Sequence, residues 1–167
     1  MKLIYLIGAS GSGKTTAAKK LEEENIVDLQ LCYLDSTGVP SHEEMISQYG
    51  SGEEWQRVKT LEWTKKIQEK YLSKKYVVFD SQTRPSFIED AVKEVGIGEY
   101  EIVLFDCTDE VRRNRLHHRG QPDLGDEQMM NWAKYLRKEC ETRGVHIADT
   151  TDLTVPACVE VLKKILE

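Results

Sequence analysis

The eight residues after the first apolar run of the chain constrain its fold more than any other feature. They read Gly8-Ala9-Ser10-Gly11-Ser12-Gly13-Lys14-Thr15, a complete G-x-x-x-x-G-K-T. The apolar run Leu3 to Ile7 precedes them, and the helix-compatible run Thr16 to Glu24 follows. Because the motif needs a strand before it and a helix after it, this stretch predicts a strand, a phosphate-binding loop and a helix.

Each residue type in this loop has a physical reason. Glycines allow backbone N–H groups to approach phosphate oxygens, and the helix N-terminus attracts anions through its dipole. Lys14 is expected to act in catalysis by reaching the β- and γ-phosphates, and the Thr15 hydroxyl to ligate Mg²⁺. The loop therefore predicts binding of ATP with Mg²⁺. The residues predicted to contact the phosphates are Gly8, Ser10, Gly11, Ser12, Gly13, Lys14, Thr15 and Thr16.

Four further short apolar runs follow along the chain. They are rich in β-branched and aromatic residues and cover Leu29 to Leu34, Tyr76 to Phe79, Ile102 to Phe105 and Val145 to Ala148. Segments with helical periodicity separate them, and this alternation is typical of a parallel sheet with helices on both faces. The sequence therefore predicts a three-layer α/β sandwich with a five-stranded parallel sheet, in one domain over residues 1–167.

Helix starts are marked by polar residues. Ser41 and Ser51 each stand three residues before a glutamate, which fits the capping box. Thr108, Asp126 and Thr154 are placed as N-caps of later helices.

The long helix after Ser51 is expected to bury an apolar stripe against the core. Its predicted members, beginning at Trp55, are Val58, Leu61, Ile67 and Tyr71.

Composition narrows the classes of partner. The formal net charge of −6 argues against nucleic-acid binding, which relies on an excess of basic residues. No apolar run approaches the roughly 20 residues of a membrane span, and no C-x-x-C pair occurs among the cysteines, so reduced thiols are expected. We therefore expect a soluble, cytoplasmic protein that binds neither nucleic acid nor membrane.

Charged residues at predicted strand ends suggest a reaction centre. Asp80 ends the third strand, where open α/β sheets bind ligands, and is a candidate Mg²⁺ ligand. Asp35 ends the second strand and is a candidate general base. Arg115 and Arg119 share a helix face and are expected to stabilise the transferring phosphate, whereas a solvated basic helix is the alternative.

The chain resembles the nucleoside monophosphate kinase-like group of P-loop phosphotransferases, which includes adenylate, shikimate and gluconate kinases. The loop from Gly8 to Thr15 is the specific part of the resemblance. The segment Val78 to Arg84 is similar to the L-D-G-F-P-R of adenylate kinases, which implies that Arg84 binds the acceptor. Gly52-Glu53-x-x-x-Arg57 is similar to the G-E-x-x-F-R of shikimate kinases, which implies the same role for Arg57.

The resemblance also implies two functional parts of a kinase. Arg115-x-x-x-Arg119 is similar to the entry of the family's lid, so residues 115–128 are expected to form a short lid and residues 36–73 an acceptor-binding helical segment. Lys134 or Arg137 would supply the returning charge on the lid side, and spacing does not choose between them.

The acceptor itself stays open at this point. Ser36-Thr37-Gly38 is similar to the S-T-G of adenylate kinases and favours a nucleotide, although residues 39–47 contain no arginine. The first alternative is a hydroxyl acceptor, as in shikimate and gluconate kinases, with Asp35 as the base. The second is a nucleotide-binding regulator or slow ATPase. The leading prediction is an ATP-dependent kinase that acts on a small polar acceptor, with a nucleotide as the first choice.

Overall fold

The computed structural model describes residues 1–167, which form two compact units. The first unit comprises residues 1–5 and 28–101, and the second comprises residues 6–27 and 102–167. Strand β1 (Lys2–Ile7) contributes residues to both. The assignment of residues 1–167 to one kinase domain stays a prediction.

A five-stranded parallel sheet flanked by helices forms the core, with strand order β2-β3-β1-β4-β5. Its other members are β2 (Leu29–Tyr33), β3 (Tyr76–Asp80), β4 (Tyr100–Asp106) and β5 (His146–Asp149). Every strand boundary lies within about two residues of its predicted position. The predicted three-layer α/β class is therefore confirmed.

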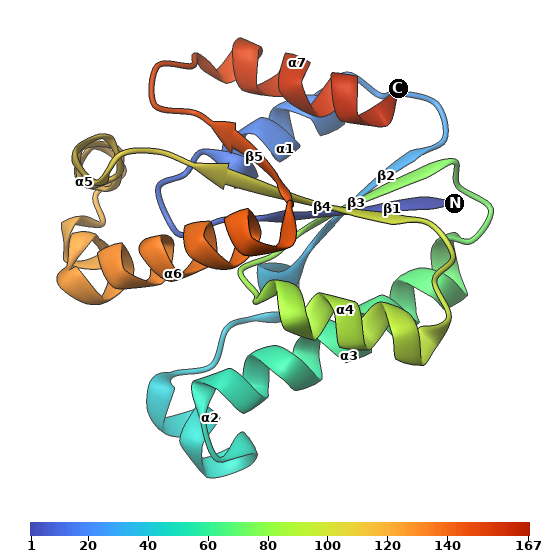
Figure 1. Ribbon diagram of the computed structural model, residues 1–167, viewed down its shortest axis with the longest axis horizontal. Coiled ribbons are helices and arrows are strands. Elements are labelled where there is room, and N and C mark those ends of the chain that lie inside the picture. Colours follow the sequence, from blue (N-terminus) through green and yellow to red (C-terminus); the bar gives the residue numbers. More distant parts are fainter. The chain divides into compact units, whose positions relative to one another are not determined.

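In the first unit, β2 and β3 pair in parallel, with Leu29 opposite Tyr76 and Tyr33 opposite Asp80. Helix α3 packs along α4 (Figure 1). The register brings the carboxyl ends of both strands to the same edge of the sheet, so the residues that follow β2 begin next to those that follow β3. The remaining elements of this unit are the 3₁₀ helix η1 (Leu34–Thr37), α2 (His42–Tyr49), α3 (Gly52–Tyr71) and α4 (Pro85–Val95).

In the second unit, β4 and β5 pair in parallel and end together at Asp106 and Asp149. Helices α1 and α7, blue and red in Figure 1, lie side by side and are bridged by Lys163 and Glu24 (2.6 Å). No helix of the chain combines the length and the apolar character needed to cross a bilayer. The elements of this unit are α1 (Lys14–Glu23), α5 (Asp109–His118), η2 (Pro122–Gly125), α6 (Glu127–Arg143) and α7 (Val155–Leu166).

The predicted helix caps are present, with one difference. Ser41 Oγ accepts from the Glu44 N–H (3.2 Å) while the Glu44 carboxylate accepts from the Ser41 N–H (2.7 Å), which completes the capping box. Ser51 accepts from the Glu54 N–H (3.0 Å), but the Glu54 carboxylate pairs with Arg57 instead of returning to Ser51. The three remaining predicted caps, Thr108, Asp126 and Thr154, each accept from a backbone N–H three residues on.

The buried face of α3 differs from the predicted apolar stripe. Val58, Leu61 and Tyr71 are only half-buried, although Ile67 is fully buried as expected. Two threonines occupy the buried face because their hydroxyls bond to carbonyls of the preceding helical turn, which satisfies them without water. The buried residues of α3 are Trp55, Thr60, Trp63, Thr64 and Ile67.

Aromatic packing joins this helix to the strands of the first unit. The rings of Trp63 and Phe79 stack with centroids 5.3 Å apart, and Tyr5 meets Phe79 edge-on at 5.8 Å. The Thr64 hydroxyl already donates to the Thr60 carbonyl (2.7 Å), so the Tyr5 hydroxyl must donate to Thr64 Oγ1 (2.7 Å). Burial raises the pKa of Tyr5, which keeps this donor protonated.

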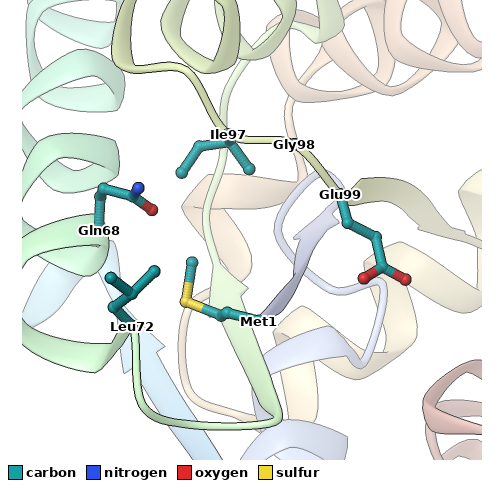
Figure 2. Close-up of a pocket in the computed structure, with 6 residues that line it drawn as sticks. All are labelled: Met1, Gln68, Leu72, Ile97, Gly98 and Glu99. Atoms are coloured by element: carbon teal, nitrogen blue, oxygen red, sulfur yellow. The ribbon is translucent and has the colours of Figure 1, made fainter.

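A cavity of about 240 Å³ opens at the start of the strands of the first unit (Figure 2). Met1 precedes β1 and Glu99 precedes β4, so the cavity lies at their amino-terminal ends. Open parallel sheets bind ligands outside the carboxyl ends of their strands, and this cavity is therefore not at the edge where the sequence predicts a site. Its lining residues are Met1, Gln68, Leu72, Ile97, Gly98 and Glu99.

Thr64→Val is expected to lower the free energy of unfolding by about 1–3 kcal/mol, because it leaves the buried Tyr5 hydroxyl without an acceptor. The measurement is urea denaturation followed by circular dichroism. Adding Tyr5→Phe to this variant removes the stranded hydroxyl and should restore part of the loss. If the double variant instead loses the sum of the two single effects, the Tyr5–Thr64 hydrogen bond does not contribute to stability as inferred.

Candidate functional site

The phosphate loop leaves β1 at Gly8 and enters α1 at Lys14. A Cβ on Gly8 would lie 2.4 Å from the Phe105 carbonyl oxygen, so no side chain fits where the loop passes β4. Gly11 and Gly13 adopt φ of +82° and +90°, which L side chains rarely tolerate. The backbone of the loop therefore requires glycine at these three positions, independently of any bound phosphate.

Helix α1 begins without a side-chain cap. Its N-cap is Gly13, whose conformation is left-handed, and its first turn carries no acidic residue. The only other α-helix without a side-chain cap bond is α4, which starts on Pro85 and so has one N–H fewer to satisfy. The first N–H groups of α1 therefore suit an anionic ligand.

Two side chains at the start of α1 have the chemistry for a nucleotide phosphate and its metal ion. Lys14 Nζ donates to Thr15 Oγ1 (3.2 Å), and both side chains are half-buried. Nowhere in the chain do three or more His, Cys, Asp or Glu side chains gather at metal-binding distance. A lone hydroxyl suits Mg²⁺, which is usually held by few protein oxygens together with phosphate oxygens and water. The predicted roles of Thr15 and Thr16 remain predictions.

Arg115 lies against the phosphate loop. Its predicted place in the lid did not imply this contact. Its guanidinium donates to the Thr150 carbonyl (2.6 Å) and to Thr150 Oγ1 (3.0 Å). Thr150, fully buried after β5, donates in turn to the Ser12 carbonyl (2.7 Å). These contacts tie α5 and the end of β5 to the phosphate loop, so Arg115 has a structural role in addition to the predicted catalytic one.

A group of three charges beneath the loop, two of them buried, was missed by sequence reasoning. Arg112 is fully buried and donates to Asp106 Oδ1 (2.7 Å), while Arg137 Nε donates to the other oxygen of Asp106 (2.5 Å). The hydrogen bond from Arg137 to Asp106 is also the main reason why the pKa of Arg137 is raised. The sequence does contain a signal for the burial of Arg112. This residue stands four residues before the buried Leu116 and so shares its helix face.

The other charges of this region face solvent. Arg119 is exposed at the C-cap of α5, and the exposed Arg113 pairs with Glu127 (3.2 Å). Lys134 Nζ lies 3.7 Å from Asp109 Oδ2, which leaves it at the surface, whereas Arg137 is engaged with Asp106. The predicted action of Arg119 on a phosphate stays a prediction.

The two arginines predicted to bind the acceptor already have partners in the first unit. Arg84 donates to Gln56 Oε1 and forms an ion pair with Glu53 (3.2 Å). Arg57 forms an exposed pair with Glu54 one helical turn away (Nε to Oε2, 3.0 Å). The exposed Arg57–Glu54 pair contributes little to stability, so a ligand could displace it at small cost.

Asp35 follows β2 and Asp80 ends the neighbouring strand β3, so both lie at the same edge of the sheet. The η1 turn is closed by its backbone, since the Gly38 N–H donates to the Asp35 carbonyl (3.0 Å), and the Asp35 carboxylate is exposed. Asp80 is buried at the end of β3, and the buried Ser81 hydroxyl next to it has no hydrogen-bond partner. Sequence reasoning did not select Ser81. This edge of the sheet thus presents the exposed Asp35 carboxylate and the buried Ser81 hydroxyl, which lacks a hydrogen-bond partner.

Comparison with solved structures identifies the fold. A sugar kinase from Janibacter sp. HTCC2649 superposes with a TM-score of 0.67 at 17% identity, covering 98% of this chain and 93% of that one. Shikimate kinase from Acinetobacter baumannii gives 0.61 at 17% identity, covering 98% and 90%. A gluconokinase from Sinorhizobium meliloti 1021 gives 0.59 at 21% identity, covering 99% and 91%. The fold is therefore that of the nucleoside monophosphate kinase-like group, as the sequence resemblance implied.

Sequence comparison gives a family. The sequence model described as the AAA domain matches residues 4–148, which include all of the phosphate loop and β5 up to Ala148. No curated protein matches the chain by sequence.

Gly11→Ala is expected to destabilise the ligand-free protein by about 1–3 kcal/mol more than Gly13→Ala, because it adds steric overlap to a similar backbone strain. The Cβ at position 11 would lie 2.9 Å from Arg112 Cγ and 3.1 Å from the Arg112 carbonyl oxygen, whereas at position 13 the nearest atom, Arg115 Nη1, is 3.7 Å away. Urea denaturation without nucleotide measures both variants. Equal losses would mean that the loop does not rest on Arg112.

Proposed function

The chain belongs to the AAA domain family of P-loop proteins, and we propose that it is an ATP-dependent kinase that transfers the γ-phosphate to a hydroxyl group of a small polar molecule. The observation that carries the proposal is the complete G-x-x-x-x-G-K-T loop ending at the uncapped N-terminus of α1. Such a loop accounts for nucleotide binding. The transfer reaction requires further residues.

Acceptor chemistry is suggested by the neighbours and by charge. The superposed proteins are named sugar kinase, shikimate kinase and gluconokinase, which favours a hydroxyl acceptor over the nucleotide of the leading sequence prediction. Arg84 and Arg57, both expected to bind the acceptor, are each paired with a glutamate. A phosphate acceptor at Arg84 would have to replace Glu53, whereas a hydroxylated acceptor can bond to both residues.

The proposed roles follow from chemistry. Lys14 binds the β- and γ-phosphates as a point charge, and Arg115 and Arg119 stabilise negative charge on the transferring phosphate. Mg²⁺ bound with ATP, held by Thr15 and Asp80, would neutralise part of the phosphate charge. Asp35 accepts the proton of the acceptor hydroxyl, because a hydroxyl is a weak nucleophile until a base removes its proton. Arg84 and Arg57 orient the acceptor.

A second candidate is a nucleotide-binding regulator or slow ATPase. One observation favours it: Arg84 and Arg57 are both paired with glutamates of α3. A protein that binds no acceptor would show the same pairing. The two functions differ in whether an acceptor accelerates ADP release.

The first test measures ADP formation from Mg·ATP with two acceptor panels, small hydroxylated acids and sugars in one and nucleoside monophosphates in the other. We expect stimulation by the first panel. Lys14→Ala should abolish it while the circular dichroism spectrum stays unchanged, because the lysine acts on phosphates and not on the core. Stimulation by monophosphates alone would reverse the acceptor assignment, and no stimulation by either panel would favour the regulator.

Asp35→Asn is expected to lower kcat with the best hydroxyl acceptor by about 10²–10⁴-fold and to leave the KM for ATP unchanged, as for loss of a general base. Asp28→Asn is the matched control, because Asp28 stands exposed at the opposite end of β2 and loses the same charge. An unchanged kcat in Asp35→Asn, or equal effects of the two substitutions, would remove Asp35 from the mechanism.

A further inference from the structure

Four consecutive carbonyl groups of the phosphate loop face two arginines of α5. Arg112 Nη1 lies 3.4 Å from the Ala9 oxygen and 3.0 Å from the Ser10 oxygen. Arg115 Nη1 lies 3.4 Å from the oxygens of both Gly11 and Ser12. The two side chains, one helical turn apart, therefore cover the carbonyl side of the loop from residue 9 to residue 12.

The orientation of these carbonyls determines where the loop directs its N–H groups. In a planar trans peptide, the C=O of one residue and the N–H of the next point in opposite directions. When the carbonyls of Ser10 and Ser12 point toward α5, the N–H groups of Gly11 and Gly13 point away from it. Binding of the carbonyls by guanidinium groups thus presents N–H donors on the opposite side of the loop, as an anion site requires.

Of the two arginines, Arg112 is the more deeply buried. Its side chain is fully buried, and Asp106 compensates its charge at 2.7 Å. A buried charge that lost such a partner would be strongly unfavourable, so the pair is held together. Arg137 occupies the second oxygen of Asp106 and restricts the carboxylate further. Gly11 packs directly on the stem of Arg112, which leaves the loop no room to settle toward α5.

We propose that Arg112, anchored by Asp106, is a positioning residue that shapes the phosphate loop for the phosphates of the nucleotide. It does not contact the ligand in this role. It acts through the carbonyls of Ala9 and Ser10, and its positive charge directly behind the loop adds to the attraction of the site for anions. The inference rests on the proposed binding of ATP and concerns the nucleotide half of the reaction alone.

The test compares Arg112→Met with Arg113→Met by isothermal titration calorimetry, with ADP, pyrophosphate and adenosine as ligands. Both variants lose one positive charge from α5, but Arg113 is exposed and bound to Glu127. We expect Arg112→Met to bind ADP and pyrophosphate about tenfold or more weakly, in line with the cost of misplaced binding groups. Its affinity for adenosine, which has no phosphate, should be unchanged, as should every affinity of Arg113→Met.

A merely structural role would lower the temperature of unfolding and leave the ratio of ADP to adenosine affinity unchanged. That result would overturn the inference, as would an equal loss of ADP affinity in both variants. If Arg112→Met does not fold, Arg112→Lys replaces it, because lysine keeps the buried charge but cannot span Asp106 and two carbonyls. Wild-type protein that bound no ADP would instead refute the proposed function, so the two failures are distinguishable.

Discussion

The direction of the peptide groups in the phosphate loop is the constraint on which the second unit depends. The loop has to expose several N–H groups on one side, so its carbonyls need partners on the other. Helix α5 supplies them through Arg112 and Arg115, and Thr150 supplies another for Ser12. Strand β1 and helix α1 hold the two ends of the loop, so the place of α5 against it follows from backbone hydrogen bonding as much as from apolar burial.

Most of the fold could be predicted because its signals are local. Five apolar runs marked the strands, and Ser41, Thr108 and Asp126 marked helix starts, since a cap depends on residues three positions apart. The buried face of α3 could not be predicted in the same way. Thr60 and Thr64 are buried there because their hydroxyls bond within the helix, a compensation that an apolar stripe does not reveal.

In the candidate site, too, the parts with local signals could be predicted and the parts that depend on tertiary contacts could not. The loop from Gly8 to Thr15 was evident from its motif, whereas the role of Arg112 depends on Asp106 at the end of a strand six residues earlier and on Arg137 from another helix. A basic helix in sequence suggests a solvated face, and one of its arginines is indeed exposed while its neighbour is completely buried. Which arginine is buried is decided by tertiary packing, not by charge pattern.

The charges of the first unit bear on the acceptor in a way that a motif does not. An arginine next to a glutamate offers both donors and acceptors, which matches a hydroxyl group, since a hydroxyl donates one hydrogen bond and accepts others. A phosphate or carboxylate only accepts and would be repelled by Glu53 beside Arg84. On the proposed assignment of Arg84 to the acceptor, its pairing with Gln56 and Glu53 favours a neutral, hydroxylated region of the acceptor next to it. An acid group on the same molecule would need a different cation, and Arg57 offers one if its exposed bond to Glu54 gives way.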